Sequence, residues 1–414
     1  MTPRLRTRDW GWIAVTLFTA CSTRPAAGVA RGPSTVVGTY AVEPGPVADG
    51  DSSRFELVAD SSGTWGRWVR FGNQPVVGLQ NVRSVGDTLT FVAGMAAGAA
   101  QLRVTIQADS TFTGEWSRGA EHVAFRGRKR DTTVSASMRT IAAIRPWEPG
   151  VISTDSGDSF GTLSADGKEF YFTKHRPDWS RHRVVLSRRD GERWSLPETL
   201  PFSGEYNDRE PKLSPNGRQL FFSSNRPVSR GGERRRDLDI WVAERGSDGR
   251  WTAPRHLGAP VNSDAQDFSP VVSGSGTLYF VSTRGAGTTD ATRNHNVWRA
   301  RLLNGRYSAP EKLGPEINSG FETNVYVTPN ERLMLVSRDG APDSFGGDDL
   351  YVSELQGGSW TPMRHLDAPI NSFEYEYGPL VAPDGGTLFF TSHRRGTADI
   401  YRVDIALVGL RPSK

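Results

Sequence analysis

The stretch LGAPVNSDAQDFSPVVSGSGTLYF, residues 257–280, sets the pattern for most of the chain. Further along, residues 313–335 read LGPEINSGFETNVYVTPNERLML. Both stretches contain a Leu-Gly pair, an Asn-Ser pair, an acidic residue, a tight turn and a short apolar run. Self-similarity at a spacing of this size indicates a repeat architecture, in which each copy is one structural unit stacked on the next.

The tight turn occurs five times, at intervals of 50, 59, 55 and 54 residues. Its copies begin at Ser164, Ser214, Ser273, Thr328 and Ala382. A short apolar strand follows each turn, then a third strand, and in most units a Trp- or Tyr-led segment ending in Pro. Asp-Gly and Asn-Gly between apolar runs are typical of hairpins, because both residues tolerate positive φ. Four strands in about fifty residues predict the blade of a β-propeller.

The repeat unit resembles the TolB-type, WD-like propeller repeat of bacterial periplasmic and outer-membrane proteins over residues 147–405. Two units depart from it, with Arg183 before the third strand of the first and Asn330-Glu331 in the turn of the fourth. We expect an all-β chain with a propeller of about five four-stranded blades over residues 147–410. The blades are expected near residues 158–207, 208–263, 264–319, 320–372 and 373–405. The last unit ends after its third strand, so residues 144–154 are expected to supply the fourth and close the ring.

Residues 36–130 show a different pattern, in which apolar and polar residues alternate in short runs between Gly, Asp and Ser turns. Period-two alternation predicts half-buried antiparallel strands. We therefore expect a small antiparallel β-barrel or sandwich there, followed by a linker over residues 131–146.

The N-terminus has the layout of a secretory signal peptide over residues 1–21, with three arginines before an apolar run too short to span a bilayer. The chain has one cysteine, Cys21, in the sequence Leu-Phe-Thr-Ala-Cys. This resembles a bacterial lipobox, which implies a lipid anchor on Cys21 and a periplasmic or outer-membrane location. Phe18 stands where a lipobox usually has an aliphatic residue, and an ordinary secretory signal is the alternative. Residues 22–35 are small, polar and rich in Pro and Gly, as expected of a tether.

The distribution of charged residues along the chain argues against a nucleic-acid partner. The net charge is +4 on 50 basic and 46 acidic residues that are interleaved along the chain. Nucleic-acid binding proteins concentrate basic residues on one face, so no nucleic-acid partner is expected.

One set of residues recurs in every blade. Each blade has an acid shortly before its inner-strand Pro or equivalent, namely Asp158, Asp208, Asp267, Glu322 and Glu376. Most blades have an arginine at the end of the second strand, namely Arg176, Arg226, Arg284 and Arg394, with Arg338 one position earlier in blade four. Five acids at one channel mouth could bind Ca²⁺ or a cationic partner. The favoured interpretation is structural, with each acid paired to an arginine or to turn N–H groups, because a catalytic residue usually occurs once.

Catalytic and metal-binding motifs are otherwise missing from the sequence, which lacks both G-x-S-x-G and H-E-x-x-H. No cofactor is expected apart from a Ca²⁺ ion at the acids. The favoured function is a non-catalytic, envelope-anchored scaffold that binds an envelope protein. The alternative is a glycan-binding or glycoside-hydrolase-like propeller that uses two of the acids. A third hypothesis is a small-ligand sensor with the N-terminal β domain as receptor.

Overall fold

The structure is a computed structural model of the chain, and it describes two groups of residues. In the N-terminal part the described ranges are 38–42, 54–60, 63–69, 77–85, 88–93, 100–107, 111–118 and 120–131. In the C-terminal part they are 144–410 without 177, 230, 286–293, 367–369, 373 and 395–396. The predicted signal peptide, Cys21 and the tether lie outside the described residues. Within the described ranges, no helix is long and apolar enough to cross a membrane.

Eight strands of the N-terminal part form a closed antiparallel barrel, because β1 pairs with both β2 and β8. They are β1 (Gly38–Val42), β2 (Arg54–Asp60), β3 (Gly63–Val69), β4 (Val77–Val85), β5 (Thr88–Ala93), β6 (Ala100–Ile106), β7 (Thr111–Arg118) and β8 (Glu121–Asp131). In β6, Leu102 and Val104 are buried while Arg103 between them is exposed, as period-two alternation predicts. Gly114 leaves room for the ring of Phe125, which a Cβ would approach to 2.4 Å.

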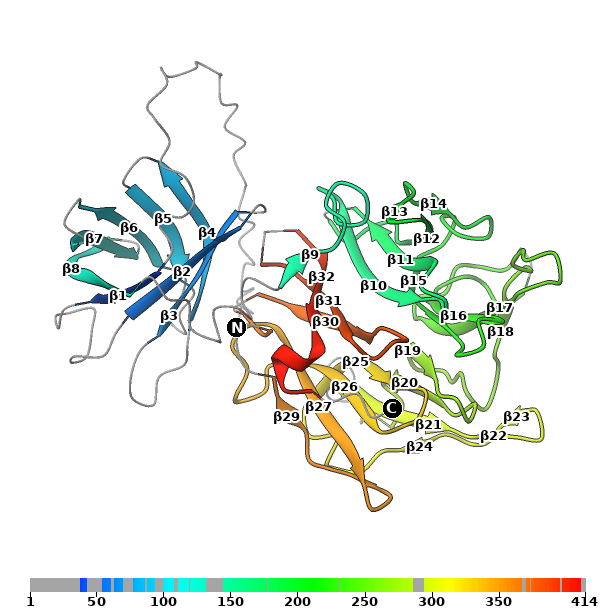
Figure 1. The fold of residues 1–414 in the computed structure, drawn as a ribbon. Coiled ribbons are helices and arrows are strands. Elements are labelled where there is room, and N and C mark those ends of the chain that lie inside the picture. The colour runs from blue at the N-terminus through cyan, green and yellow to red at the C-terminus, as the bar shows by residue number, and fades with distance from the viewer. Residues whose placement is uncertain are drawn as a thin grey trace, which may run out of the picture.

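The C-terminal part is a propeller in which five antiparallel sheets surround a common axis (Figure 1). Blade one contains β10 (Gly157–Leu163), β11 (Glu169–His175), β12 (Arg183–Asp190), β13 (Arg193–Trp194) and β14 (Glu198–Thr199). Blade two contains β15 (Asp208–Leu213), β16 (Gln219–Ser224), β17 (Asp239–Glu244) and β18 (Arg255–His256). The first strand of each blade lies innermost, and the chain then runs outward through the blade. This confirms the predicted all-β fold with five blades.

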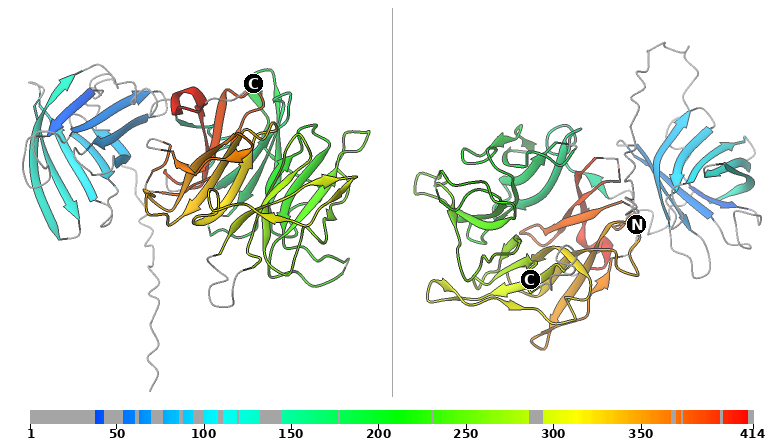
Figure 2. Two further views of the ribbon diagram at one scale, coloured as in Figure 1. Left: turned by 90° about the horizontal axis from the view of Figure 1, so that it is seen from below. Right: turned by 180° about the vertical axis from the view of Figure 1, so that it is seen from behind.

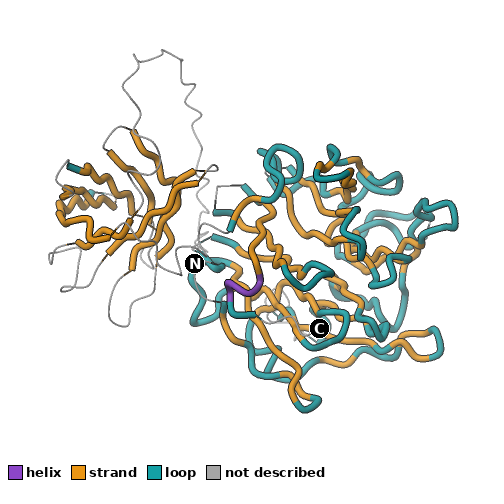
Figure 3. The backbone as a smooth tube through the Cα atoms, in the orientation of Figure 1, coloured by secondary structure: helices purple, strands orange, loops and turns teal. Residues whose placement is uncertain are grey.

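The remaining blades repeat this order with small additions. Blade three contains β19 (Asp267–Val272), β20 (Leu278–Ser282), β21 (Asn296–Ala300) and β24 (Glu311–Lys312), with a hairpin of β22 (Leu302–Leu303) and β23 (Arg306–Tyr307). Blade four contains β25 (Phe321–Val327), β26 (Leu333–Asp339), β27 (Asp348–Gln356), β28 (Ser359–Trp360) and β29 (Arg364–His365). Blade five contains β30 (Glu376–Val381), β31 (Thr387–Ser392) and β32 (Asp399–Asp404), followed by the short 3₁₀ helix η2 (Ile405–Val408). Figure 3 shows how strands and loops alternate through the whole ring.

The ring is closed by a strand from the start of the propeller rather than from its end. β9 (Arg145–Pro146) pairs antiparallel with β32, so it is the outer strand of blade five. In Figure 1 these two strands lie side by side although β9 is cyan and β32 is red, which marks them as far apart in the sequence. Beyond β9, the N–H of Trp147 donates to the carbonyl of Ile400 at 2.7 Å, and the Trp147 ring packs on Phe389 and Phe170. We call residues 144–154 the closing segment. It is held by hydrogen bonds and by a buried aromatic side chain.

Neighbouring blades are joined near the axis by a repeated hydrogen bond. The inner strands bulge two residues after the acid, where Phe160, Glu210 and Ser269 have φ of 51°, 59° and 53°. The bulge exposes a backbone N–H, which donates to a hydroxyl on the second strand of the preceding blade. The three acceptors, at 3.0 to 3.1 Å, are Thr391, Thr173 and Ser223.

The Asn of the repeated Asn-Ser pair has a structural role. Asn262, Asn318 and Asn371 each accept a hydrogen bond from one N–H of the third strand and donate to the carbonyl of the same residue. The side-chain amide thus continues the strand pairing at a place where the fourth strand has ended. The recurrence of Asn-Ser in the sequence is explained by this contact.

Candidate functional site

All five repeated acids are buried, with relative exposure of 0%. Their carboxylates accept hydrogen bonds from the inter-blade turn that precedes them. Asp158 accepts from the N–H of Thr154 at 2.8 Å, and Asp267 accepts from the N–H of Ser263 at 2.7 Å. They therefore fix the turn between blades, and they do not form an open ring of ligands at the axis.

Each acid also contacts a cation. Arg226 reaches Asp208 and Arg284 reaches Asp267, both at 2.5 Å. Arg394 lies 3.2 Å from Glu376, Arg338 lies 3.4 Å from Glu322, and Lys174 lies 2.5 Å from Asp158.

The expected pairing of Asp158 with Arg176 is corrected by this geometry. In blades two, three and five a serine faces the acid across the strand pair, and the arginine two residues later bends back to reach it. In blade one Lys174 occupies the serine position and meets the acid directly, so Arg176 lies exposed at the surface. Arg338 takes the same position in blade four, so it lies two positions, and not one, before the place of the arginine in blades two, three and five.

Burial dominates the electrostatics of these acids. It raises the pKa of Asp158, Glu322 and Glu376 above the usual carboxyl range, although Lys174, Arg338 and Arg394 act in the opposite direction. Ca²⁺ needs several accessible oxygen ligands. Among the described residues, no group of three or more His, Cys, Asp or Glu is placed to hold a metal ion.

The repeated residues thus belong to the scaffold, and residues that break the repeat are candidates for function. We use the name mouth cluster for nine such residues at the end of the ring where the inner strands begin. They are His175, Trp179, His182, Arg209, His295, Asp348, Tyr375, Tyr377 and His393. Every blade contributes at least one of them. Figure 2 shows the propeller from two further directions.

Blades one and five share the aromatic part of the mouth cluster. Trp179 stacks on His175 at 4.3 Å and lies parallel to His393 at 5.8 Å. Tyr377 contacts Nε2 of His393 through its hydroxyl at 3.1 Å. Trp179 is 40% exposed and Tyr375 is 49% exposed. Two large aromatic side chains therefore face solvent beside a set of buried imidazoles.

The loop that carries Trp179 has an unusual backbone. Trp179 and Arg181 have φ of 59° and 53°, a left-handed conformation that costs about 1–3 kcal/mol for residues other than glycine. Gly157 lies beneath the loop, and a Cβ there would come within 2.0 Å of the His175 ring. The corresponding residues of the other blades all have side chains, and His393, the equivalent of His175 in blade five, contacts the ring of Tyr375 there. Strain at this loop supports a functional role.

Arg209 is the cation of the mouth cluster. Its Nε lies 3.5 Å from Oε1 of Glu210 but makes no hydrogen bond with a described residue. Burial is the main cause that lowers the pKa of His182 to about 3 and the pKa of His295 to about 4. The charge of Arg209 is the second largest cause of both shifts. These imidazoles are therefore neutral at physiological pH.

Several buried nitrogens around Arg209 have no hydrogen-bond partner among the described residues. They are both ring nitrogens of His182, Nε2 of His175 and Nδ1 of His295. His182 is only 4% exposed. A buried polar group without a partner costs about 1–3 kcal/mol, and such groups concentrate where a ligand or partner supplies the missing bonds.

Asp348 adds a titratable acid to the mouth cluster. Burial, followed by the charge of Asp339, raises its pKa to about 7. Asp348 therefore changes its charge near neutral pH, and its charge raises the pKa of Tyr377 further, although burial is the main cause of that shift.

Below the mouth cluster the axis is filled by side chains. Nζ of Lys212 donates to the carbonyl of Gly161 at 2.8 Å and lies 5.6 Å from the ring of Tyr326. The hydroxyl of Tyr326 donates to the carbonyl of Val381 at 3.0 Å. Burial lowers the pKa of Lys212 to about 7. Lys212 and Tyr326 thus connect four of the five blades across the axis.

We expect His182→Phe to stabilise the protein at acidic pH. The folded-state pKa of His182, about 3, lies below its unfolded value near 6.5, so the unfolded chain takes up the proton first as pH falls. The free energy of unfolding is therefore unaffected by this proton above pH 6.5, and it falls as the pH decreases from 6.5 toward 3. The change in the free energy of unfolding caused by the substitution should therefore be more favourable by about 2 kcal/mol at pH 5 than at pH 8. Urea unfolding at both pH values measures this difference.

The matched control for this experiment is His122→Phe in the barrel. His122 is exposed, and a surface pair such as the one with Glu115 contributes less than about 1 kcal/mol, so the difference between the effects at the two pH values should be smaller than for His182→Phe. An equal effect of His182→Phe at pH 5 and pH 8 would contradict the burial of a neutral imidazole at this position.

Sequence comparison gives no further assignment. No protein-family model matches the sequence, and no curated protein does. Among solved structures, the chain is similar to an oligogalacturonate lyase from Vibrio parahaemolyticus, at 12% identity over 86% of this chain and 97% of that chain, with a TM-score of 0.32. It is also similar to a thermostable family-43 glycoside hydrolase, at 11% identity over 60% of this chain and 88% of that chain, with a TM-score of 0.42.

A third similar structure is an α-L-arabinofuranosidase from Lactobacillus brevis, at 13% identity over 60% of this chain and 90% of that chain, with a TM-score of 0.39. The strand topology carries the fold assignment, and no activity is transferred from these proteins.

The sequence interpretation found the repeated acids but missed the mouth cluster. One signal was present, because the residue after each acid differs between blades, as Ser159, Arg209, Phe268, Thr323 and Tyr377. A charged residue at one of five otherwise uncharged positions marks blade two as exceptional. His175 and His393 occupy equivalent positions of the repeat, but His182 and His295 have no such relation to them, and the contacts among these blades form only in the folded ring.

Proposed function

We propose that this chain is a non-catalytic binding protein of the bacterial envelope, with a TolB-type propeller whose mouth cluster binds another envelope protein. Secretion through residues 1–21 and a lipid anchor on Cys21 belong to the same proposal. The observation that carries it is the combination of Trp179, Tyr375 and Arg209 at one end of the ring. Trp, Tyr and Arg are the residues most enriched at the energetic centres of protein interfaces.

The chemistry of the mouth cluster favours a partner segment with an acidic side chain. Arg209 has an Nε that makes no hydrogen bond with a described residue, and an arginine binds a carboxylate through charge-assisted hydrogen bonds. The neutral imidazoles of His182 and His295 offer further donors or acceptors to the same segment. The exposed rings of Trp179 and Tyr375 supply apolar contact at the rim.

Glycoside cleavage by the repeated acids is the second candidate that the sequence raised. It requires two carboxylates that reach a substrate from different environments. The five acids are buried and each contacts a cation and a turn, so cleavage would require two of them to leave these partners. These contacts support binding over cleavage at the acids.

The proposal is tested by crosslinking an affinity-tagged full-length protein in cells and identifying attached proteins by mass spectrometry. Wild type should retain one dominant envelope protein, and Arg209→Met should lose at least about 90% of it, which corresponds to a tenfold loss of affinity. Arg176→Met is the control, because Arg176 is exposed at the same end of the ring and contacts no acid of the repeat. Equal capture by wild type and Arg209→Met, with equal melting temperatures, would overturn the proposal.

A further inference from the structure

A cavity of about 380 Å³ lies at the opposite end of the ring from the mouth cluster, where blade five meets blade one. It is lined by the hairpin turns of both blades and by the closing segment that contains Trp147. Small-molecule sites typically have volumes of roughly 300–1,000 Å³. The cavity is large enough for a small ligand and is separate from the proposed protein-binding surface.

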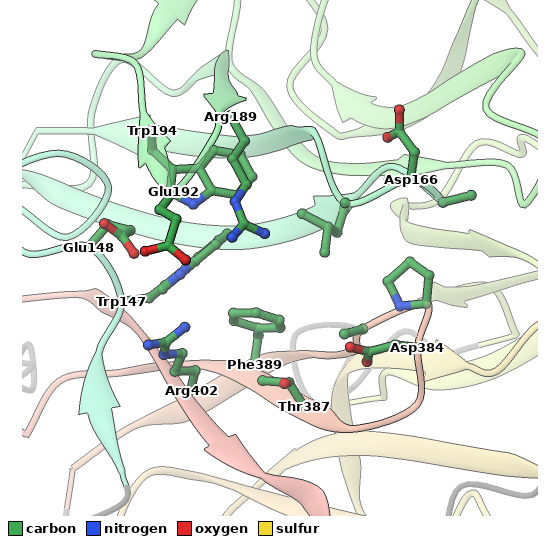
Figure 4. A pocket seen from close by; sticks show the side chains of 15 residues that line it. Trp147, Glu148, Asp166, Arg189, Glu192, Trp194, Asp384, Thr387, Phe389 and Arg402 are labelled. Atoms are coloured by element: carbon green, nitrogen blue, oxygen red, sulfur yellow. The ribbon is translucent and has the colours of Figure 1, made fainter.

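The cavity combines an aromatic wall with charged side chains of both signs. Trp147, Trp194 and Phe389 form the wall, with Trp147 lying 5.1 Å from Trp194 and 4.6 Å from Phe389. Figure 4 shows the guanidinium groups of Arg189 and Arg402 approaching the same space from opposite sides. Glu148 and Glu192 lie on the same side of the cavity as Trp147.

The neighbouring seam, between blades one and two, has a cavity of its own, of about 600 Å³, but the Arg245 side chain that lines it is paired. There Arg245 of blade two makes two hydrogen bonds with Glu169 of blade one, at 2.6 and 2.8 Å. Nε1 of Trp251 donates to the hydroxyl of Tyr171 at 3.3 Å. The four side chains hold the two blades together and satisfy one another.

Two of these four side chains are changed at the closing seam. Arg189 and Trp194 of blade one pair in the same register as Arg245 and Trp251. In blade five, however, Thr387 stands at the position of Glu169, and Phe389 stands at the position of Tyr171. The carboxylate that would bind Arg189 is missing, and so is the hydroxyl that would meet Trp194.

The polar groups at the cavity are consequently available to a ligand. Among the described residues, the side chains of Arg189, Arg402, Glu148 and Glu192 make no hydrogen bond or ion pair with one another or with any other residue. A ligand with a net charge of either sign would meet like charges as well as opposite ones. A neutral polyol has hydroxyl groups that accept from the guanidinium groups and donate to the carboxylates. The apolar face of a sugar ring also fits against the ring of Trp194, the partly exposed residue of the aromatic wall.

We propose that this cavity is a binding site for a neutral saccharide, held beside Trp194 and the closing segment, between the hairpin turns of blades one and five. The site contains no repeated acid and does not depend on the mouth cluster. Because Trp147 and Glu148 belong to the closing segment, a bound sugar contacts both sides of the seam and stabilises the closed ring.

The test uses the full-length protein and a panel of neutral oligosaccharides built from glucose, xylose, arabinose or N-acetylglucosamine, with acidic and amino sugars as further arms. Binding is followed by tryptophan fluorescence, which reports on Trp147 and Trp194, and by the melting temperature. The key variant is Thr387→Glu with Phe389→Tyr, which restores the pair of side chains found at the neighbouring seam. It should fold and melt at or above the wild-type temperature and bind the sugar at least about tenfold more weakly.

Gln219→Glu is the control, because it introduces the same side chain at the equivalent position of another seam. It should leave saccharide binding unchanged. The proposal is overturned if no neutral saccharide binds the wild-type protein, if charged sugars bind more tightly than neutral ones, or if binding survives the double substitution. Loss of the envelope partner in Arg209→Met would leave saccharide binding intact, so the two proposals fail independently.

Discussion

Replacing Arg226 with methionine is expected to lower the free energy of unfolding of the propeller by about 3–5 kcal/mol. Arg226 contacts Asp208 at 2.5 Å, and both side chains are buried. Methionine replaces the guanidinium, whose Cζ lies 5.0 Å from the centre of the Phe222 ring, with an apolar group and leaves the carboxylate of Asp208 in the interior without its cation. Denaturant unfolding followed by tryptophan fluorescence measures the loss.

The chain offers a matched control for this experiment. Arg176 follows the second strand of blade one as Arg226 follows that of blade two, but Asp158 is paired with Lys174. Arg176→Met should therefore change stability by less than about 0.5 kcal/mol, as is usual for surface substitutions. Lys174→Met should cost about as much as Arg226→Met. A large effect of Arg176→Met, or a small one of Lys174→Met, would contradict the assignment of the cation in blade one.

Trp147→Ala is expected to cost about 3–5 kcal/mol, which is typical of removing a large buried aromatic side chain. Trp147 is almost fully buried, and its ring packs on Phe170 of blade one, Phe389 of blade five and Trp194. Because the side chain lies directly after β9, its loss weakens the contact that closes the ring. Thermal and denaturant unfolding should both show the decrease.

Trp179→Ala removes the same kind of side chain from the exposed rim of the mouth cluster and serves as the comparison. Since Trp179 is partly exposed and carried by a strained loop, its removal should cost less than about 1 kcal/mol. Equal effects of the two substitutions would mean that closure does not depend on the segment around Trp147.

The propeller could be predicted from the sequence because its information is repeated. The Asp-Gly and Asn-Gly turns, the apolar second strands and the Asn-Ser pairs each occur in several blades, so an error in one copy is corrected by the others. Asn371 illustrates this, because its amide holds the third strand of blade four as Asn262 holds that of blade two. Residue patterns that recur in register define local structure well.

The mouth cluster and the cavity could not be predicted in this way, because they depend on contacts between blades. The replacement of Glu169 by Thr387 at the equivalent position is visible in the sequence, but its effect on Arg189 follows only when blades five and one are adjacent. The pairing of Asp158 depends on strand register, which places Lys174 rather than Arg176 opposite the acid. Unique residues have no second copy against which a prediction can be checked.

Unique residues at the mouth cluster, rather than the repeated acids, are expected to contact the partner. Site-specific photo-crosslinking in cells tests this contact most directly, with the photoreactive residue at Tyr375 in the mouth cluster or at Leu196, which is 72% exposed between β13 and β14. We predict that Tyr375 crosslinks to one envelope protein and that Leu196 does not. Equal crosslinking from both positions, or crosslinking from Leu196 alone, would contradict a partner-binding site at the mouth cluster.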